Sequence, residues 1–254
     1  MSSDITRAEV CVTACADAWR GAGEILAHAV GTVPAISARL ARLTFEPDLV
    51  LSDGECFFVS DPPPLGKTAS NGGGTIEAWV PFRSIFDVLN SGRRHSMMGA
   101  SQIDRFGNQN ISAIGDWRKP TRQLIGVRGA PGNTVNHRTD YWVARHSARV
   151  FVEHVDVVSG VGNDRAAAES GSTMKYHDLG VVVTDLAVLD YSAEGVLKVR
   201  SLHPGVSAED VQSNTGFDID TSSATTTRLP SEEELQLIRT VIDPTSLRAR
   251  EVRS

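Results

Sequence analysis

The stretch that decides the fold of this chain is Met98-Gly99-Ala100-Ser101-Gln102-Ile103-Asp104-Arg105-Phe106-Gly107-Asn108-Gln109-Asn110. Gln102-Ile103-Asp104 is predicted to end a strand, because a short apolar segment runs there into residues typical of turns. Phe106-Gly107-Asn108 is the predicted turn, since glycine adopts a positive φ without steric cost and asparagine tolerates the left-handed region. We therefore expect a strand that ends in a tight turn.

A second apolar segment, Leu124-Ile125-Gly126, breaks into the loop Gly126-Val127-Arg128-Gly129-Ala130-Pro131-Gly132-Asn133. Glycines that follow a strand let the backbone approach a ligand closely and present N–H groups to an anion or oxyanion. On spacing alone, two surface turns without chemistry are the simpler interpretation of both segments. The loop is therefore a candidate ligand site that needs further support.

Both segments resemble the beta subunits of family I CoA transferases, of the glutaconate CoA-transferase type. Those subunits carry a strand ending in Gln-x-Asp, a Gly-Asn-x-Asn turn and a glycine-rich loop. Further matches follow in the family's order: Val182-Val183-Thr184-Asp185-Leu186-Ala187-Val188, Leu202-His203-Pro204-Gly205-Val206 and Thr215-Gly216-Phe217. The resemblance implies a Rossmann-like open sheet flanked by helices, in a subunit that pairs with an alpha subunit and shares its active site.

Composition limits the classes of function. The 254 residues are 41% hydrophobic, enough to bury a sizeable α/β core. The net charge of −6 and the lack of a basic run disfavour nucleic acid and anionic membranes as partners. Cys11, Cys15 and Cys56 lack the neighbours of a zinc site and are expected to be free thiols. The sequence lacks a signal-like or membrane-spanning apolar run, so we expect a cytoplasmic protein. We also expect no metal site.

Local patterns predict alternating helices and strands, as in an α/β open sheet. Helices are predicted at residues 6–28, 33–41 and 82–89, from Ser207 onward, and at residues 231–242. Strands are predicted at residues 49–51, 111–114, 149–158 and 180–188, with a hairpin over 189–201. Thr6 and Glu9 form a predicted capping box. Gly21 and Gly23 weaken the second half of their helix, so we expect a break there. We expect an α/β domain over residues 1–220, followed by a linker and helix over 221–254 that pack on the domain or a partner.

The turn after residues 49–51 is where the resemblance implies a catalytic residue. In these beta subunits, a Glu in a Glu-Ser-Gly or Glu-Asn-Gly turn attacks the acyl-CoA thioester. This chain has Asp53-Gly54-Glu55 there instead. Asp53 is one methylene too short, and Glu55 lacks the small residues that should follow it. Because attack geometry tolerates little displacement, we expect neither to be a nucleophile, and the catalytic residue stays unassigned.

Arg128 and Asn133 depart from the small residues that transferases carry in the glycine-rich loop. An Arg can donate two parallel hydrogen bonds to a carboxylate, which suggests a substrate with a free carboxylate besides its thioester. A structural salt bridge is the alternative explanation. The predicted substrate-binding residues are Gln102, Asn108, Gly126, Arg128, Gly129 and Asn133, of which Gln102 and Asn108 would order the loops.

Two further groups of residues have open interpretations. Arg93, Arg94 and His95 form a small basic patch, either a solvated helix end or a contact to a CoA phosphate or substrate carboxylate. Asn136, His137 and His146 are candidate general bases, although no spacing marks one of them as catalytic.

Within the family, the departures resemble beta subunits of steroid ring-cleaving CoA hydrolases. The resemblance implies water addition and retro-Claisen cleavage of a cyclic β-keto enoyl-CoA that carries a propanoate, with a Glu base on the alpha subunit. It also implies an α2β2 heterotetramer, and coenzyme A as part of the substrate without a covalently bound cofactor. Two alternatives stay open: a CoA transferase that uses Asp53 or Glu55, and a non-catalytic structural or ligand-sensing subunit.

Overall fold

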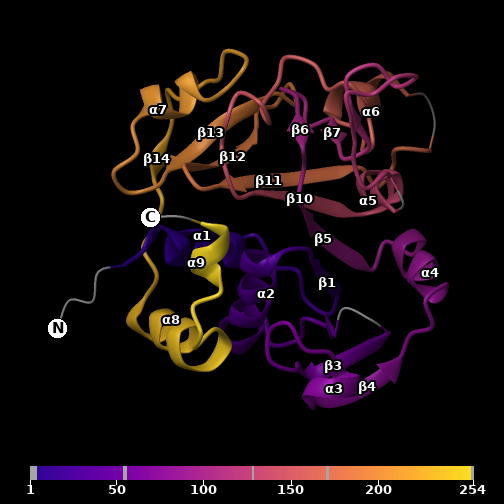
Figure 1. Cartoon of the computed structure of the whole chain (residues 1–254), viewed down its shortest axis with the longest axis vertical. Helices are drawn as coiled ribbons and strands as arrows, with labels where there is room; N and C mark the ends of the chain where they lie inside the picture. The colour runs from indigo at the N-terminus through magenta and orange to yellow at the C-terminus, as the bar shows by residue number, and fades with distance from the viewer. Residues whose placement is uncertain (1–4, 54–55, 128, 170–171, 253–254) are drawn as a thin grey trace. The chain divides into compact units, whose positions relative to one another are not determined.

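The computed structural model describes residues 5–53, 56–127, 129–169 and 172–252. Two compact units are present: unit 1 combines Met1–Met97 with Arg228–Ser254, and unit 2 is Met98–Thr227. Figure 1 labels their helices and strands. The domain boundary expected near residue 220 stays a prediction.

Unit 1 has a parallel strand pair, a small antiparallel sheet and helices from both ends of the chain. Its elements are α1 (Arg7–Asp17), β1 (Leu26–Ala29), α2 (Thr32–Thr44), β2 (Leu51–Ser52), β3 (Phe57–Asp61), α3 (Ala69–Gly72), β4 (Thr75–Trp79), α4 (Ser84–Asn90), β5 (Arg94–Met98, whose last residue belongs to unit 2), α8 (Glu232–Gln236), the π-helix η1 (Leu237–Ile242) and α9 (Arg248–Glu251). β1 pairs with β5 in parallel, whereas β2, β3 and β4 form an antiparallel sheet. α1 packs against α2 (Figure 1).

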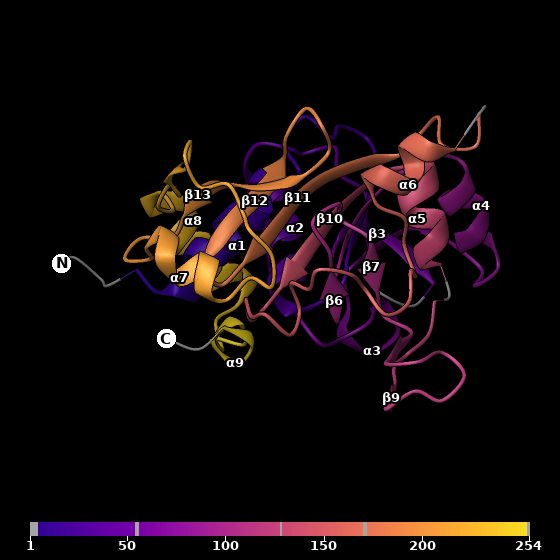
Figure 2. The ribbon, with the colours of Figure 1, turned by 90° about the horizontal axis from the view of Figure 1, so that it is seen from above.

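Unit 2 is built on the strands β10 to β14. Its elements are β6 (Gln102–Ile103), β7 (Gln109–Asn110), β8 (Ala113–Ile114), β9 (Arg122–Gln123), α5 (Ala130–Asn136), β10 (Arg138–Val143), α6 (Asn163–Ala168), β11 (Asp178–Thr184), β12 (Ala187–Tyr191), β13 (Leu197–Leu202), α7 (Ala208–Ser213) and β14 (Thr225–Thr226). β10 to β13 lie side by side in both views (Figure 1, Figure 2). The β10–β11 and β13–β14 pairs are parallel, and β11, β12 and β13 are antiparallel. The predicted α/β sheet with helices is confirmed.

Several local predictions are confirmed by the hydrogen bonds that the sequence pattern implied. The Glu9 N–H donates to Thr6 Oγ1 at 3.3 Å and the Thr6 N–H donates to Glu9 Oε2 at 2.9 Å, which completes the capping box. Helix α1 ends at Asp17, and Gly21 and Gly23 then adopt φ values of 75° and 64°. The break expected at Gly21 and Gly23 is therefore confirmed, although the residues after it form strand β1 rather than more helix.

The strand predicted over residues 149–158 is wrong. Only Phe151 makes a β-bridge there, to Ile103, and the surrounding residues form turns. The alternating apolar pattern has another cause, because Phe151 is fully buried and its carbonyl accepts the N–H of Gly216 at 2.8 Å. The apolar run at 180–188 also divides into two strands, since Thr184 Oγ1 accepts the N–H groups of residues 186 and 187.

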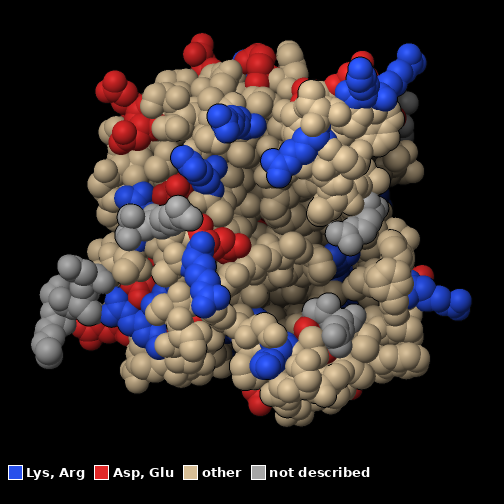
Figure 3. Space-filling model, viewed as in Figure 1, with Lys and Arg blue, Asp and Glu red and all other residues tan. Residues whose placement is uncertain are grey.

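Surface features agree with the acidic composition. On the face seen in Figure 3, acidic and basic side chains are interspersed, without a continuous basic stripe. Among the residues that the structure describes, no helix is both long and apolar enough to cross a membrane.

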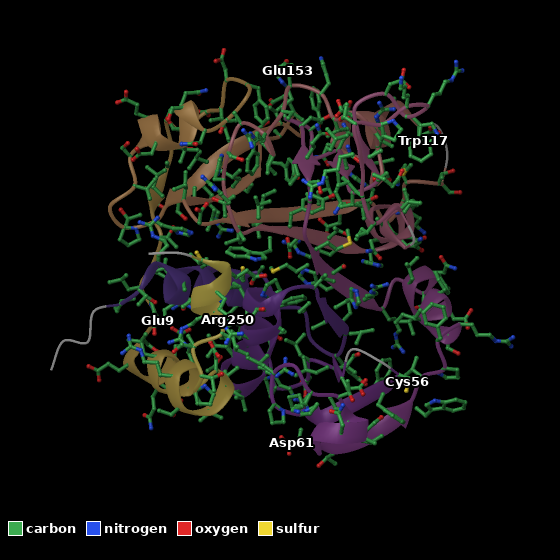
Figure 4. The ribbon with its side chains drawn as sticks, in the orientation of Figure 1. Glu9, Cys56, Asp61, Trp117, Glu153 and Arg250 are labelled. Carbon is green, nitrogen blue, oxygen red and sulfur yellow. The ribbon has the colours of Figure 1, made fainter. Side chains whose placement is uncertain are left out.

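The C-terminal helices are attached to α1 and α2 by buried charges. Glu9 is 1% exposed, and its carboxylate accepts hydrogen bonds from Arg239 at 2.6 and 2.9 Å and from Arg248 at 3.0 Å. The Glu251 carboxylate accepts the N–H of Val33 at 2.7 Å and so caps the start of α2. Figure 4 labels Glu9 and, on α9, Arg250. Ion pairs therefore join the C-terminal helices to α1 within unit 1.

Replacing Glu9 by Gln should destabilise the protein by about 3 kcal/mol at pH 7, because the buried Arg248 loses a charged partner. Burial alone would raise the pKa of Glu9, but hydrogen bonds from Arg239 and Thr6 lower it from 4.5 to about 2. The stabilisation is therefore present above pH 4.5 and is lost as the pH falls toward 2. Urea denaturation from pH 7 to pH 3 measures this, with the exposed Glu233→Gln as control. A constant difference between wild type and variant across this range would contradict the assignment.

Candidate functional site

The turn between β6 and β7 is organised around the buried carboxylate of Asp104. Asp104 Oδ1 accepts the N–H groups of Phe106 and Asn108, each at 3.0 Å, and Oδ2 accepts the Asn108 side-chain amide at 2.9 Å. Gly107 has a φ of 82°, and a Cβ there would overlap the Tyr191 hydroxyl. Burial raises the pKa of Asp104 despite these donors. The tight turn predicted at Phe106-Gly107-Asn108 is confirmed.

Asn108 and Gln102 connect this turn to the loop at residues 156–164. Asn108 Nδ2 donates to Asp164 at 2.9 Å, and Asn108 Oδ1 accepts the N–H of Gly162 at 2.8 Å. Gln102 Nε2 donates to Asp156 Oδ2 at 3.0 Å, and its oxygen accepts the N–H of Asp156 at 3.0 Å. Both side chains are buried and connect the turn to the loop at residues 156–164. A contact of either side chain with substrate stays a prediction.

The glycine-rich loop is only partly available as a set of backbone donors. Gly126 has a φ of 88°, but its N–H already donates to the carbonyl of Ile111 at 3.1 Å. Gly129 precedes helix α5, and its carbonyl accepts the N–H of Asn133 at 3.1 Å. Ile125 is 71% exposed on the same loop. The predicted residues Arg128 and Glu55 lie outside the residues that the structure describes.

Two amide oxygens beside this loop are buried acceptors. Asn133 is 3% exposed, its amide nitrogen lies against the sulfur of Met98, and its oxygen has no hydrogen-bond partner among the described residues. The Gln109 amide nitrogen donates to the carbonyl of Gly99 at 2.6 Å, and its oxygen is also without a described partner. Buried acceptors of this kind accept a hydrogen bond from ordered water or a ligand. Sequence reasoning missed Gln109, which is the variable residue of the Gly-Asn-x-Asn turn.

Asp53 has its carboxylate occupied by the chain's own backbone. Oδ1 accepts the N–H groups of Cys56 and Phe57 at 3.1 and 3.0 Å, and Oδ2 accepts the N–H of Ala69 at 3.1 Å. A carboxylate that holds three backbone donors orders a turn and presents a poor lone pair for attack. This geometry favours the expectation that Asp53 is no nucleophile.

The predicted basic patch of Arg93, Arg94 and His95 is not one surface group, because strand β5 begins at Arg94. Arg93 is exposed, whereas Arg94 and His95 are 5% and 2% exposed. The ring of His95 lies 4.4 Å from that of Trp19, centroid to centroid. The interpretation as a solvated helix end is wrong for Arg94 and His95, because both belong to a buried strand.

The candidate bases have structural partners. His146 Nδ1 lies 3.1 Å from Thr184 Oγ1, and Nε2 lies 3.0 Å from Thr215 Oγ1. Burial lowers the pKa of His146 to about 3, so the ring is neutral at physiological pH. Asn136 donates to the carbonyl of Gly132 at 2.9 Å, and His137 Nδ1 lies 3.0 Å from the carbonyl of Arg138. These contacts favour structural roles.

The motifs near the C-terminus form one hydrogen-bonded unit around Thr184. His203 Nε2 lies 2.9 Å from the Thr184 carbonyl, and the Thr184 hydroxyl lies next to His146. His146 in turn contacts Thr215. Gly216 passes so close to Phe151 that a Cβ would lie 2.6 Å from its carbonyl oxygen. The Thr-Asp, His-Pro-Gly and Thr-Gly-Phe series is therefore explained by packing within unit 2.

A separate cavity of about 590 Å³ lies in unit 1. Its lining includes Arg39 and Arg42 of α2, the proline segment at residues 62–64, and residues 241–245. Among the predicted site residues that the structure describes, none lines this cavity.

Comparison with known proteins defines the class. Residues 23–214 match the family model described as coenzyme A transferase, so the chain belongs to that family, as predicted. The chain is 53% identical to the "Cholesterol ring-cleaving hydrolase IpdB subunit" of Rhodococcus jostii RHA1, over 98% of this chain and 97% of that protein. The crystal structure of Rhodococcus jostii RHA1 IpdAB matches with a TM-score of 0.94 and 51% identity, covering 99% of this chain and all of that one. A glutaconate CoA-transferase subunit of Acidaminococcus fermentans is 30% identical over 85% of each chain.

Replacing Asp53 by Asn should leave kcat/KM of the assembled enzyme within about threefold of wild type, because the amide oxygen still accepts two backbone N–H groups. The lost bond to Ala69 should lower stability by about 1–3 kcal/mol. Steady-state kinetics and thermal unfolding measure both effects, with Asp53→Ala as the variant that removes every acceptor. A nucleophilic Asp53 would instead give a loss of about ten-thousandfold for both variants.

Proposed function

We propose that this chain is the beta subunit of a heteromeric enzyme that hydrolytically opens a ring of a cyclic β-keto enoyl-CoA in sterol catabolism. The observation that carries the proposal is the 53% identity, over nearly the whole chain, to a cholesterol ring-cleaving hydrolase subunit. The structural match to IpdAB supports it. The occupied carboxylate of Asp53 also favours hydrolysis over transfer, because a transferase needs a free carboxylate to carry CoA.

The proposed reaction is a retro-Claisen hydrolysis. A Glu of the alpha subunit takes a proton from water, and the water oxygen bonds to the ring ketone carbon. The tetrahedral alkoxide collapses to a carboxylic acid and breaks the bond to the neighbouring carbon. The electron pair of that bond becomes the enolate of the thioester, which a proton then quenches. The product is the substrate plus one water, with its thioester intact.

This chain would contribute binding and order rather than the base. Gln102 and Asn108 fix the loops, Gly126 and Gly129 shape the glycine-rich segment, and Asn133 offers a buried acceptor. A guanidinium at position 128 would hold the propanoate carboxylate by paired hydrogen bonds.

The proposed assembly is an α2β2 heterotetramer that acts in the cytoplasm on an acyl-CoA. Coenzyme A would enter as part of the substrate, with no covalently bound cofactor. Neither nucleic acid nor a membrane is a proposed partner, in keeping with the negative net charge.

CoA transfer between carboxylic acids is the second candidate function. It is favoured by the 30% identity to a glutaconate CoA-transferase subunit and by the shared family. In that reaction Asp53 or Glu55 would carry CoA as a thioester.

Incubating the purified alpha–beta complex with a cyclic β-keto enoyl-CoA should give a product heavier by one water that still carries CoA. Mass spectrometry of the small molecules measures this, and the intact mass of each subunit reveals any covalent adduct. CoA on an added carboxylic acid, together with a CoA-linked subunit, would establish the transferase instead. An unaltered substrate with a correctly assembled complex would refute both activities.

Replacing Arg128 by Ala should raise KM or lower kcat by about tenfold or more, the scale of a lost charge-assisted hydrogen bond. Arg122 is an exposed arginine on β9, shortly before the same loop, so Arg122→Ala is the matched control. Steady-state kinetics with the cyclic substrate compare the two variants. Equal kinetics for Arg128→Ala and wild type would remove Arg128 from the site.

A further inference from the structure

Strand β5 carries a buried arginine without a counter-charge. Arg94 is 5% exposed, and its buried Nε has no hydrogen-bond partner within the described part of the chain. Ser96, two residues further along the strand, is fully buried, and its hydroxyl also has no described partner. Residues two apart on a strand point to the same face of the sheet. One face of β5 therefore presents a cation and a hydroxyl that the described chain leaves unsatisfied.

The other face of β5 has an ordinary buried environment. His95 packs there against Trp19, and Met97 is fully buried. Among the described side chains of β5, the unsatisfied nitrogen and oxygen atoms therefore belong to Arg94 and Ser96.

The strand register relates Arg94 to the strand that precedes the turn at Asp53, where the family resemblance implies a catalytic residue. Arg94 and Val50 both pair with Leu26 of β1, from opposite sides. Two strand spacings separate Arg94 from Val50, or about 10 Å. The turn at Asp53 follows three residues after Val50.

An isolated buried cation is unfavourable, and proteins that keep one pair it with an anion. Burial lowers the pKa of Arg94 to about 10, which still leaves the group charged at neutral pH. The described hydrogen bonds of Asp53 come from the backbone N–H groups of Cys56, Phe57 and Ala69, and none of them comes from Arg94. The guanidinium therefore requires an anion from outside the described residues.

We propose that Arg94, with Ser96 beside it, binds an oxyanion of the acyl-CoA substrate, either the carboxylate of the acyl part or a phosphate of coenzyme A. The inference rests on the proposed function for the identity of the substrate. A guanidinium suits this task because it presents a planar set of donors that matches carboxylate and phosphate oxygens. The hydroxyl of Ser96 adds a donor on the same face. The sequence left the basic patch as either a solvated helix end or a contact to a CoA phosphate or substrate carboxylate, and the burial of Arg94 favours the second interpretation.

The test compares Arg94→Met with Arg93→Ala in the complete alpha–beta complex. Arg93 is the exposed neighbour of the same charge, so the pair separates a local site from general electrostatics. For Arg94→Met we expect a KM at least tenfold higher, with unchanged assembly and an unchanged or higher melting temperature without substrate. Arg94→Lys should recover part of the loss, because it restores the charge but not the paired donors. Arg93→Ala should stay within twofold of wild type.

Two competitors distinguish the source of the oxyanion. If Arg94 binds a phosphate, the inhibition constant of free coenzyme A rises at least tenfold in Arg94→Met. If it binds the acyl carboxylate, that constant is unchanged and the constant of the CoA-free substrate acid rises instead. Either result supports the proposal.

Three outcomes would overturn it. Kinetics of Arg94→Met equal to wild type would show that no substrate anion is bound. A drop in melting temperature with an unchanged KM would place the counter-charge within this chain, and weaker assembly with an unchanged KM would place it on the alpha subunit. If Arg94→Met does not fold, Arg94→Lys and competitor binding by calorimetry decide in the same way. A wild-type complex that does not hydrolyse the substrate would refute the proposed function. An active complex whose KM does not change in Arg94→Met would refute only the role of Arg94.

Discussion

A buried carboxylate cannot remain without hydrogen-bond donors, and this constraint at Asp104 fixes the turn from which the candidate site is built. The chain folds around the carboxylate so that two backbone N–H groups and the Asn108 amide reach it. Asn108 also bonds to Gly162 and Asp164, and so connects the turn to a second loop. The Gln-x-Asp and Gly-Asn-x-Asn motifs are thus parts of one polar network that positions two loops of unit 2.

Thr184 has a similar part in the second series of family motifs. Its hydroxyl turns the chain between β11 and β12, and its two polar groups contact His146 and His203. The motifs that indicate the family are therefore largely internal supports. This explains why they identify the coenzyme A transferase family well while saying little about which reaction a member catalyses.

The chemistry depends on positions where the chain departs from the transferase pattern. At the place of the nucleophilic Glu, Asp53 caps a turn with both carboxylate oxygens. The residues that we propose for substrate binding are cationic, with Arg94 buried in β5 and Arg128 in the glycine-rich loop. This proposed set of binding residues is compatible with hydrolysis by water and a base on the partner subunit.

The sequence by itself determined the features that depend on near neighbours. These include the capping box of Thr6, the hairpin at residues 193–195 and the turn at Gly107, because each is decided within about four residues. The ordered motifs also determined the family. Only the tertiary structure decided that Phe151 lies in a loop and that Arg94 is buried. Burial and long-range hydrogen bonds join residues far apart in the chain, and no local pattern records which strands and loops will enclose a given side chain.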